Sequence, residues 1–302
     1  SVGTALSYML HPYRPRWDLS QLRSLLRFSR WILLGSIIDF VIQRVPDFLI
    51  GRYLTAQVLG IFRVSREIAT LPTSELIFPI MRAVFPGYAA VAHDRAELAR
   101  SFLLVQGTVL MLSLPAGLSI ILLAEPIVRV LLGAKWFAAI PLVQVLGLYG
   151  AISVFQATNM SIFNVLGVPK WGVLVRGTEA LVLCGLLGLS AYTGSGAAGM
   201  AWAVLGALLV ALPLGMLLIE RLLQLGWRQR VAVTWRPLLG ALSVAVTLML
   251  LQQAWPNTDD TLAAVAYLAL AVPSALVSFT TMVFLSWQLA GRPPGPEAQL
   301  LE

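Results

Sequence analysis

Residues 36–82 read SIIDFVIQRVPDFLIGRYLTAQVLGIFRVSREIATLPTSELIFPIMR, an apolar stretch that carries an unusual number of charges. An ionisable side chain at the centre of a lipid-exposed helix costs at least about 2.5–3.5 kcal/mol. We therefore expect these side chains to face one another or a watery cavity. The charged residues of the stretch are Asp39, Arg44, Asp47, Arg52, Arg63, Arg66, Glu67, Glu75 and Arg82.

Helical periodicity sorts these residues into two polar stripes. At 100° per residue, one helix presents Ser36, Asp39, Gln43 and Asp47 on one side, with Arg44 on its flank. The next helix presents Arg63, Arg66, Glu67, Thr70 and Ser74 in the same way. Two neighbouring helices with such stripes predict a polar path between them, which we interpret as a substrate cavity.

The whole composition predicts an all-α polytopic membrane protein. The chain has 302 residues, of which 58% are hydrophobic and 12% charged, and its mean hydropathy is +0.83. Soluble domains carry about 25% charged residues, and a span needs about 20 apolar residues. About eight spans are expected, at residues 31–53, 61–92, 101–124, 137–166, 200–219, 238–255 and 262–289, with the fifth following the loop 167–172 and ending near residue 192. Pro46 should kink the first of them, and Pro72, Pro79 and Pro86 should bend the second.

The distribution of charged residues, apolar runs and turn residues divides the chain into five parts. Residues 1–30 are expected to hold the end of a preceding helix and a basic, amphipathic cytoplasmic linker. Residues 31–219 form a six-helix lobe, 220–236 a basic cytoplasmic loop, 237–290 two trailing spans, and 291–302 a disordered tail. The opening residues suggest that the chain is the C-terminal part of a longer protein.

The net charge of +7 does not indicate nucleic-acid binding, because the basic residues lie mainly between spans. When the loops are assigned alternately to the two sides, most Lys and Arg collect on one side. That side is predicted to be cytoplasmic and to hold both chain ends. Cys184 is the single cysteine, so a disulfide framework and a thiolate metal site are excluded. We see no nucleophile–base pair, metal-spaced cluster or phosphate-binding glycine loop, and expect neither an enzyme nor a cofactor.

Several short motifs follow one another from Asp47 to Pro169. They are Asp47, Ile50-Gly51-Arg52, Leu59-Gly60, Leu71-Pro72, Phe85-Pro86, Ala124-Glu125-Pro126-Ile127-Val128, Leu132-Gly133-Ala134-Lys135-Trp136 and Leu166-Gly167-Val168-Pro169. In this order and spacing, the chain resembles bacterial polysaccharide and O-antigen flippases of the Wzx type. These are PST-family members of the multidrug/oligosaccharidyl-lipid/polysaccharide (MOP) exporter superfamily. Thr55 and Phe62 depart from the family pattern, where glycine and tyrosine are usual.

The resemblance implies helices seven to fourteen of a MOP/MATE-like fold in the bacterial inner membrane. It implies flipping of an undecaprenyl-pyrophosphate-linked oligosaccharide for O-antigen, capsule or exopolysaccharide synthesis, by alternating access. Expected partners are this lipid-linked oligosaccharide, membrane lipids, a coupling proton or sodium ion, and polysaccharide polymerase or assembly proteins.

Arginines suit such a cargo, because guanidinium groups bind phosphate oxygens bidentately. The alternative roles are snorkelling for Arg63 and Arg66 and a lipid-headgroup contact for Arg82. Amide and hydroxyl side chains on a stripe of residues 149–164 would bind sugar, or would only join helices. The candidate substrate-binding residues are Arg63, Arg66, Arg44, Arg82, Gln43, Tyr149, Gln156 and Asn164.

Four acids are candidates for ion coupling: Asp39, Asp47, Glu67 and Glu179. Each has a structural alternative. Arg44 would neutralise Asp47, Arg63 would pair with Glu67, and Arg176 would pair with Glu179. Asp39 shows no local partner, which keeps a coupling role open beside a structural one.

Two other functions compete with the flippase. A MATE-like drug or metabolite antiporter needs an acidic cavity for cationic substrates. A membrane-embedded glycosyltransferase or polymerase needs catalytic carboxylates or metal ligands and sizeable loops, which this sequence does not offer.

Overall fold

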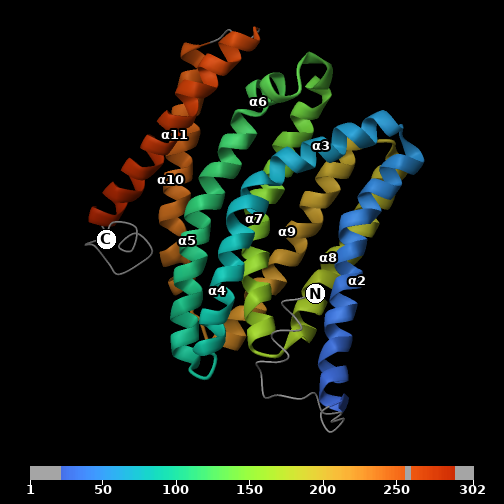
Figure 1. Ribbon diagram of the computed structural model, residues 1–302, viewed down its shortest axis with the longest axis vertical. Helices are drawn as coiled ribbons and strands as arrows, with labels where there is room; N and C mark the ends of the chain where they lie inside the picture. Colours follow the sequence, from blue (N-terminus) through green and yellow to red (C-terminus); the bar gives the residue numbers. More distant parts are fainter. Residues whose placement is uncertain (1–21, 256–259, 290–302) are drawn as a thin grey trace, which may run out of the picture.

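The computed structural model describes residues 22–255 and 260–289, and every regular element within these ranges is a helix (Figure 1). The expected preceding helix, the tail and most of the turn before residue 260 lie outside the described residues. The elements are α2 (Leu22–Tyr53), α3 (Ala56–Pro72), the π-helix η1 (Thr73–Ile77), α4 (Phe78–Ala90), α5 (Arg95–Leu122), α6 (Ala124–Leu131), the 3₁₀-helix η2 (Ala134–Ala139), α7 (Ile140–Val165), α8 (Pro169–Thr193), α9 (Gly196–Leu223), α10 (Trp227–Ala254) and α11 (Thr261–Leu289).

Seven of these helical segments are long and apolar enough to cross a membrane, which confirms the all-α, multi-pass class. Helix α2, which was expected to contain the first of the eight spans, is not among these seven segments. It has 32 residues, enough for about 48 Å of helix at 1.5 Å per residue. Asp39, Arg44 and Asp47 lie in its central turns, so its composition does not mark it as a span.

The proline-rich second span is bent as predicted. Helix α3 ends at Pro72, the chain makes a π-helical turn at Thr73–Ile77, and α4 continues with Pro79 in its first turn. Proline removes a backbone donor and clashes with the preceding turn, which favours such a bulge. In Figure 1, α3 and α4 therefore run in clearly different directions along one continuous helical segment.

The helices pack as a bundle in which α7 is central. It contacts α3, α5, α8 and α9, while α2 packs on α8, and α10 lies between α5 and α11. Glycines permit two close approaches to α7. A Cβ atom on Gly150 would lie 2.9 Å from the carbonyl oxygen of Ala69, and one on Gly117 would lie 2.5 Å from the Cβ of Ala151.

The segment 220–236, expected to be a basic loop, is mostly helical. Helix α9 continues to Leu223 and α10 begins at Trp227, with Gln224 in the left-handed conformation at the cap. The basic residues of this segment therefore belong to the helices, Arg221 to α9 and Arg228, Arg230 and Arg236 to α10. Arg230 is itself buried, 3.4 Å from the Asn159 side-chain oxygen. At the other end of the chain, α2 already begins by Leu22, so the expected linker and first span share one helix.

Candidate functional site

A cavity of about 620 Å³ opens between α2, the α3–η1 segment, α7, α8 and α9. Its polar lining comes from α2 and the α3–η1 segment, which carry the two predicted stripes, and from α7 and α8. The apolar part includes Trp31, Phe78 and Met160. The lining polar and charged residues are Ser36, Asp39, Gln43, Arg66, Glu67, Thr70, Thr73, Ser74, Tyr149, Ser153, Gln156, Asn164 and Arg176.

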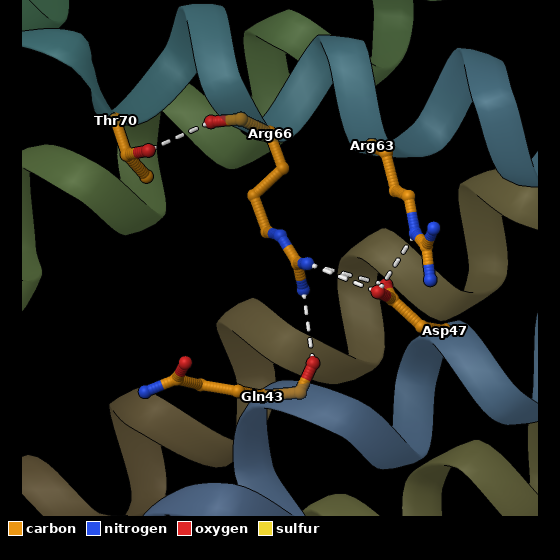
Figure 2. A network of polar contacts seen from close by, with 5 residues as sticks. All are labelled: Gln43, Asp47, Arg63, Arg66 and Thr70. Atoms are coloured by element: carbon orange, nitrogen blue, oxygen red, sulfur yellow. Dashed lines mark hydrogen bonds and ion pairs between the residues drawn. The ribbon is translucent and has the colours of Figure 1, made fainter.

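Beside this cavity, two arginines of α3 contact Asp47 of α2 (Figure 2). Arg63 Nε lies 3.0 Å from Asp47 Oδ2, and Arg66 Nη2 lies 3.2 Å from Oδ1. Arg66 also donates from Nη1 to the carbonyl oxygen of Gln43 at 3.3 Å. The carboxylate is 5% exposed, while the Arg63 side chain is 53% exposed. This contact holds α2 against α3.

Two expected local pairings are therefore wrong. Arg44, three residues before Asp47, is exposed and makes no ion pair with it. Arg63 turns to Asp47 and not to Glu67. Within residues 22–255 and 260–289, Glu67 has no ion-pair partner, and it is exposed on the cavity wall.

A second network forms around Arg176 of α8. Its Nε lies 2.7 Å from Asp39 Oδ1, and its Nη1 lies 2.6 Å from Glu179 Oε2. Gln156 of α7 donates from Nε2 to the same Glu179 oxygen. The Arg176–Glu179 pairing is confirmed. Asp39 has no local partner, as expected, but it pairs with an arginine of another helix, 137 residues away in the sequence.

Some of the predicted site residues line the cavity, and others do not. Those that line it are Asp39, Gln43, Arg66, Glu67, Tyr149, Gln156 and Asn164. Arg63, Asp47 and Glu179 lie behind the wall as ion-pair partners. Arg44 and Arg82 are exposed away from it. Whether any of them binds substrate or an ion stays a prediction.

Sequence reasoning named Arg176 only as a pairing residue, although it lines the cavity. The signal was present, because it is an arginine in an apolar run that forms a span. Trp31 and Phe78 were also missed as lining residues. Aromatic residues are common throughout such spans, so their positions alone did not distinguish them.

The charges on the wall balance. Among the described lining residues, Arg66 and Arg176 are opposed by Asp39 and Glu67. The residues described contain no group of three or more His, Cys, Asp or Glu side chains placed to hold a metal ion. The wall therefore offers hydrogen bonds and aromatic surface with little formal charge.

Residues 1–141 match the family model described as "Polysaccharide biosynthesis protein". The chain is 24% identical over 161 residues to the teichuronic acid biosynthesis protein TuaB of Bacillus subtilis, covering 51% of this chain and 33% of TuaB. It is 27% identical over 200 residues to the succinoglycan biosynthesis transport protein ExoT of Rhizobium meliloti, covering 65% of this chain and 40% of ExoT.

A third relative is the lipopolysaccharide biosynthesis protein WzxC of Escherichia coli K12. It is 28% identical over 142 residues, which are 46% of this chain and 29% of WzxC. The chain thus spans between 29% and 40% of the length of these three relatives. No solved structure is significantly similar to it.

Proposed function

We propose that this chain is part of a transporter of lipid-linked oligosaccharide, because its residues 1–141 match the family model described as "Polysaccharide biosynthesis protein". The transporter flips an undecaprenyl-pyrophosphate-linked oligosaccharide across the bacterial inner membrane, for O-antigen, capsule or exopolysaccharide synthesis. One curated relative is named a transport protein for succinoglycan biosynthesis, which supports this assignment.

The observation that carries the proposal is the polar cavity within a bundle of apolar helices. Charged groups at membrane depth are tolerated where they line a watery space or pair with one another. Here both conditions hold, since Arg66, Arg176 and Asp39 line the cavity and are ion-paired. Bent and discontinuous helices beside a midplane site are typical of alternating-access transporters. The α3–η1–α4 segment supplies such a bend.

The test is complementation of polysaccharide export in cells that lack the corresponding gene. Arg66→Gln removes one wall cation and should reduce surface polysaccharide, with lipid-linked oligosaccharide accumulating in the membrane. Arg44→Gln is the matched control, because Arg44 is exposed and outside the cavity. Protein amounts are compared by immunoblot. Normal export by Arg66→Gln at normal protein levels would remove this residue from the transport path.

One observation favours the antiporter as a second candidate. Glu67 is an unpaired carboxylate on the cavity wall among the described residues, and a free carboxylate attracts cationic compounds. Efflux of a cationic dye is then measured in cells with and without polysaccharide synthesis. Efflux that depends on the protein and survives loss of that synthesis would support the antiporter.

A further inference from the structure

The arginines of the cavity are already neutralised by the protein itself. Arg66 is held by Asp47, and Arg176 by Asp39 and Glu179. These carboxylates are fixed to their helices and cannot leave when an anion arrives. A phosphate oxygen that replaced Glu179 would leave that carboxylate without its cation, and one that replaced Asp47 on Arg66 would leave Asp47 with Arg63 alone. Asp47 and Glu179 are nearly inaccessible to solvent, so losing a cation contact is unfavourable for both.

A lipid diphosphate therefore fits this wall poorly. It concentrates negative charge on a few oxygens, whereas the lining arginines and carboxylates cancel in formal charge. The unpaired Glu67 would repel it further, because like charges disfavour each other at short range.

The remaining lining suits a saccharide. Gln43 and Asn164 supply amides, and Ser36, Ser74 and Ser153 supply hydroxyl groups. A carboxylate accepts hydrogen bonds from several directions, as sugar hydroxyl groups require. Pockets for small polar ligands combine apolar and aromatic surface with a few such groups. Trp31, Phe78 and Tyr149 provide that aromatic surface.

The geometry points to a division of the substrate: the cavity holds the oligosaccharide, with Glu67 accepting sugar hydroxyl groups, and the diphosphate stays outside. This inference rests on the proposed function. Arg82 and Lys170 are two cations of the described residues that are placed to meet the diphosphate. Arg82 lies one helical turn beyond the lining residue Phe78, and Lys170 directly follows the lining residue Pro169. Both are exposed, and neither makes an ion pair within residues 22–255 and 260–289.

The experiment measures protection of a cysteine placed in the cavity wall. Ser153→Cys is introduced into a Cys184→Ser background, which removes the single native cysteine. Maleimide labelling of the purified chain is followed with two probes. One is lipid-linked oligosaccharide extracted from cells that make the polysaccharide, and the other is undecaprenyl diphosphate without sugar. A ligand at ten times its Kd leaves about one protein in eleven free, so labelling should slow about tenfold.

Lipid-linked oligosaccharide should slow labelling of the cavity cysteine, and undecaprenyl diphosphate should not. Tyr192→Cys in the same background is the control, because Tyr192 is 90% exposed and does not line the cavity. Its labelling rate should be the same with either lipid. Equal slowing of the cavity cysteine by both lipids would put the diphosphate inside and overturn the inference.

A paired variant tests the role of Glu67. Glu67→Ala should weaken protection by the lipid-linked oligosaccharide, whereas Glu75→Ala, an exposed acid of η1 that does not line the cavity, should not. Unchanged protection in Glu67→Ala removes this side chain from sugar binding. Slowing by neither lipid also overturns the inference, while the export assay decides separately whether the transporter proposal survives.

Discussion

At the scale of the residue, the dominant feature is that charges within the bundle are paired across helices. Asp47 of α2 meets Arg63 and Arg66 of α3, and Arg176 of α8 meets Asp39 of α2. The α2 helix is thereby held on both sides by ionic contacts. This explains how a helix with so many charges is accommodated beside apolar ones.

Asp47→Asn should lower the stability of the protein. It leaves Arg63 and Arg66 without their carboxylate, and breaking a buried pair costs about 3–5 kcal/mol. Because the Arg63 side chain is 53% exposed, we expect a smaller loss, about 2–3 kcal/mol. The measurement is thermal unfolding in detergent or nanodiscs.

The matched control is Arg44→Gln, which changes an exposed arginine of the same helix and should shift stability by less than about 0.5 kcal/mol. A double variant, Asp47→Asn with Arg66→Gln, should be less destabilised than the sum of the two single changes, because each removes the same contact. Additive effects would mean that Asp47 and Arg66 do not interact.

At the scale of the element, close packing of α7 on the bent helix sets the shape of the cavity wall. Gly150 lets the backbone of α7 approach Ala69, and Thr73 Oγ1 donates to the Gly150 carbonyl oxygen at 3.1 Å. The contact lies where α3 passes into the π-helical turn. Small residues at helix contacts in membranes commonly allow this kind of approach.

Gly150→Ala should destabilise the protein by about 1–3 kcal/mol, the usual cost of overpacking. The added Cβ would lie 2.9 Å from a backbone oxygen, which cannot rotate away. Gly185→Ala on α8 is the control, because nothing lies within 4 Å of its added Cβ. It should be neutral or slightly stabilising, since alanine favours helices. Equal unfolding temperatures for both variants would contradict the close contact.

Helix α5 begins at an aspartate cap outside the spans. The backbone N–H groups of Glu97 and Ala96 donate to Asp94 Oδ1, which lowers the pKa of this carboxyl from its ordinary value of 3.8. A carboxyl whose pKa is lower in the folded state stabilises the fold above the unfolded pKa. That contribution is lost as the pH falls through the folded pKa.

Asp94→Asn keeps a capping side chain but removes its titration. The difference in unfolding temperature between the native chain and this variant should therefore shrink as the pH falls below about 4. Asp94→Ala should lower the unfolding temperature at neutral pH, because the cap is lost. A constant difference between native and Asp94→Asn protein from pH 7 to pH 3 would contradict this role.

At the scale of the whole molecule, the spans alternate in direction, so their connections gather at two ends (Figure 1). The turns at 91–94, 166–168 and 224–226 follow α4, α7 and α9 at one end. The turns at 54–55 and 194–195 lie at the other. Basic residues flank the first set, which remains predicted to be cytoplasmic.

Single cysteines test this orientation in a Cys184→Ser background. Gly226→Cys should react with a membrane-impermeant maleimide only after the inner membrane is opened. Tyr192→Cys should react in cells whose outer layers alone are permeable. Labelling of Gly226→Cys before the inner membrane is opened would reverse the predicted topology.

Much of this architecture could be read from local sequence. Long apolar runs must become helices in a membrane, because a lipid environment leaves no other partner for backbone groups. Proline at residues 72, 79 and 86 predicted that the second span bends. Charged residues between positions 39 and 67 predicted the cavity wall. The motifs from Asp47 to Pro169 also indicated a resemblance to polysaccharide flippases, and residues 1–141 match the family model described as "Polysaccharide biosynthesis protein".

The partner of each charge was decided only by the tertiary structure. Spacing along one helix suggested Arg44 for Asp47 and Arg63 for Glu67, and both suggestions were wrong. It suggested no partner for Asp39, whose partner lies on another helix. Periodicity determines which side chains share a face, whereas packing determines which face meets which. Asp39 pairs with Arg176 across 137 residues of sequence. No local pattern contains such a pairing, because it depends on which helices pack together.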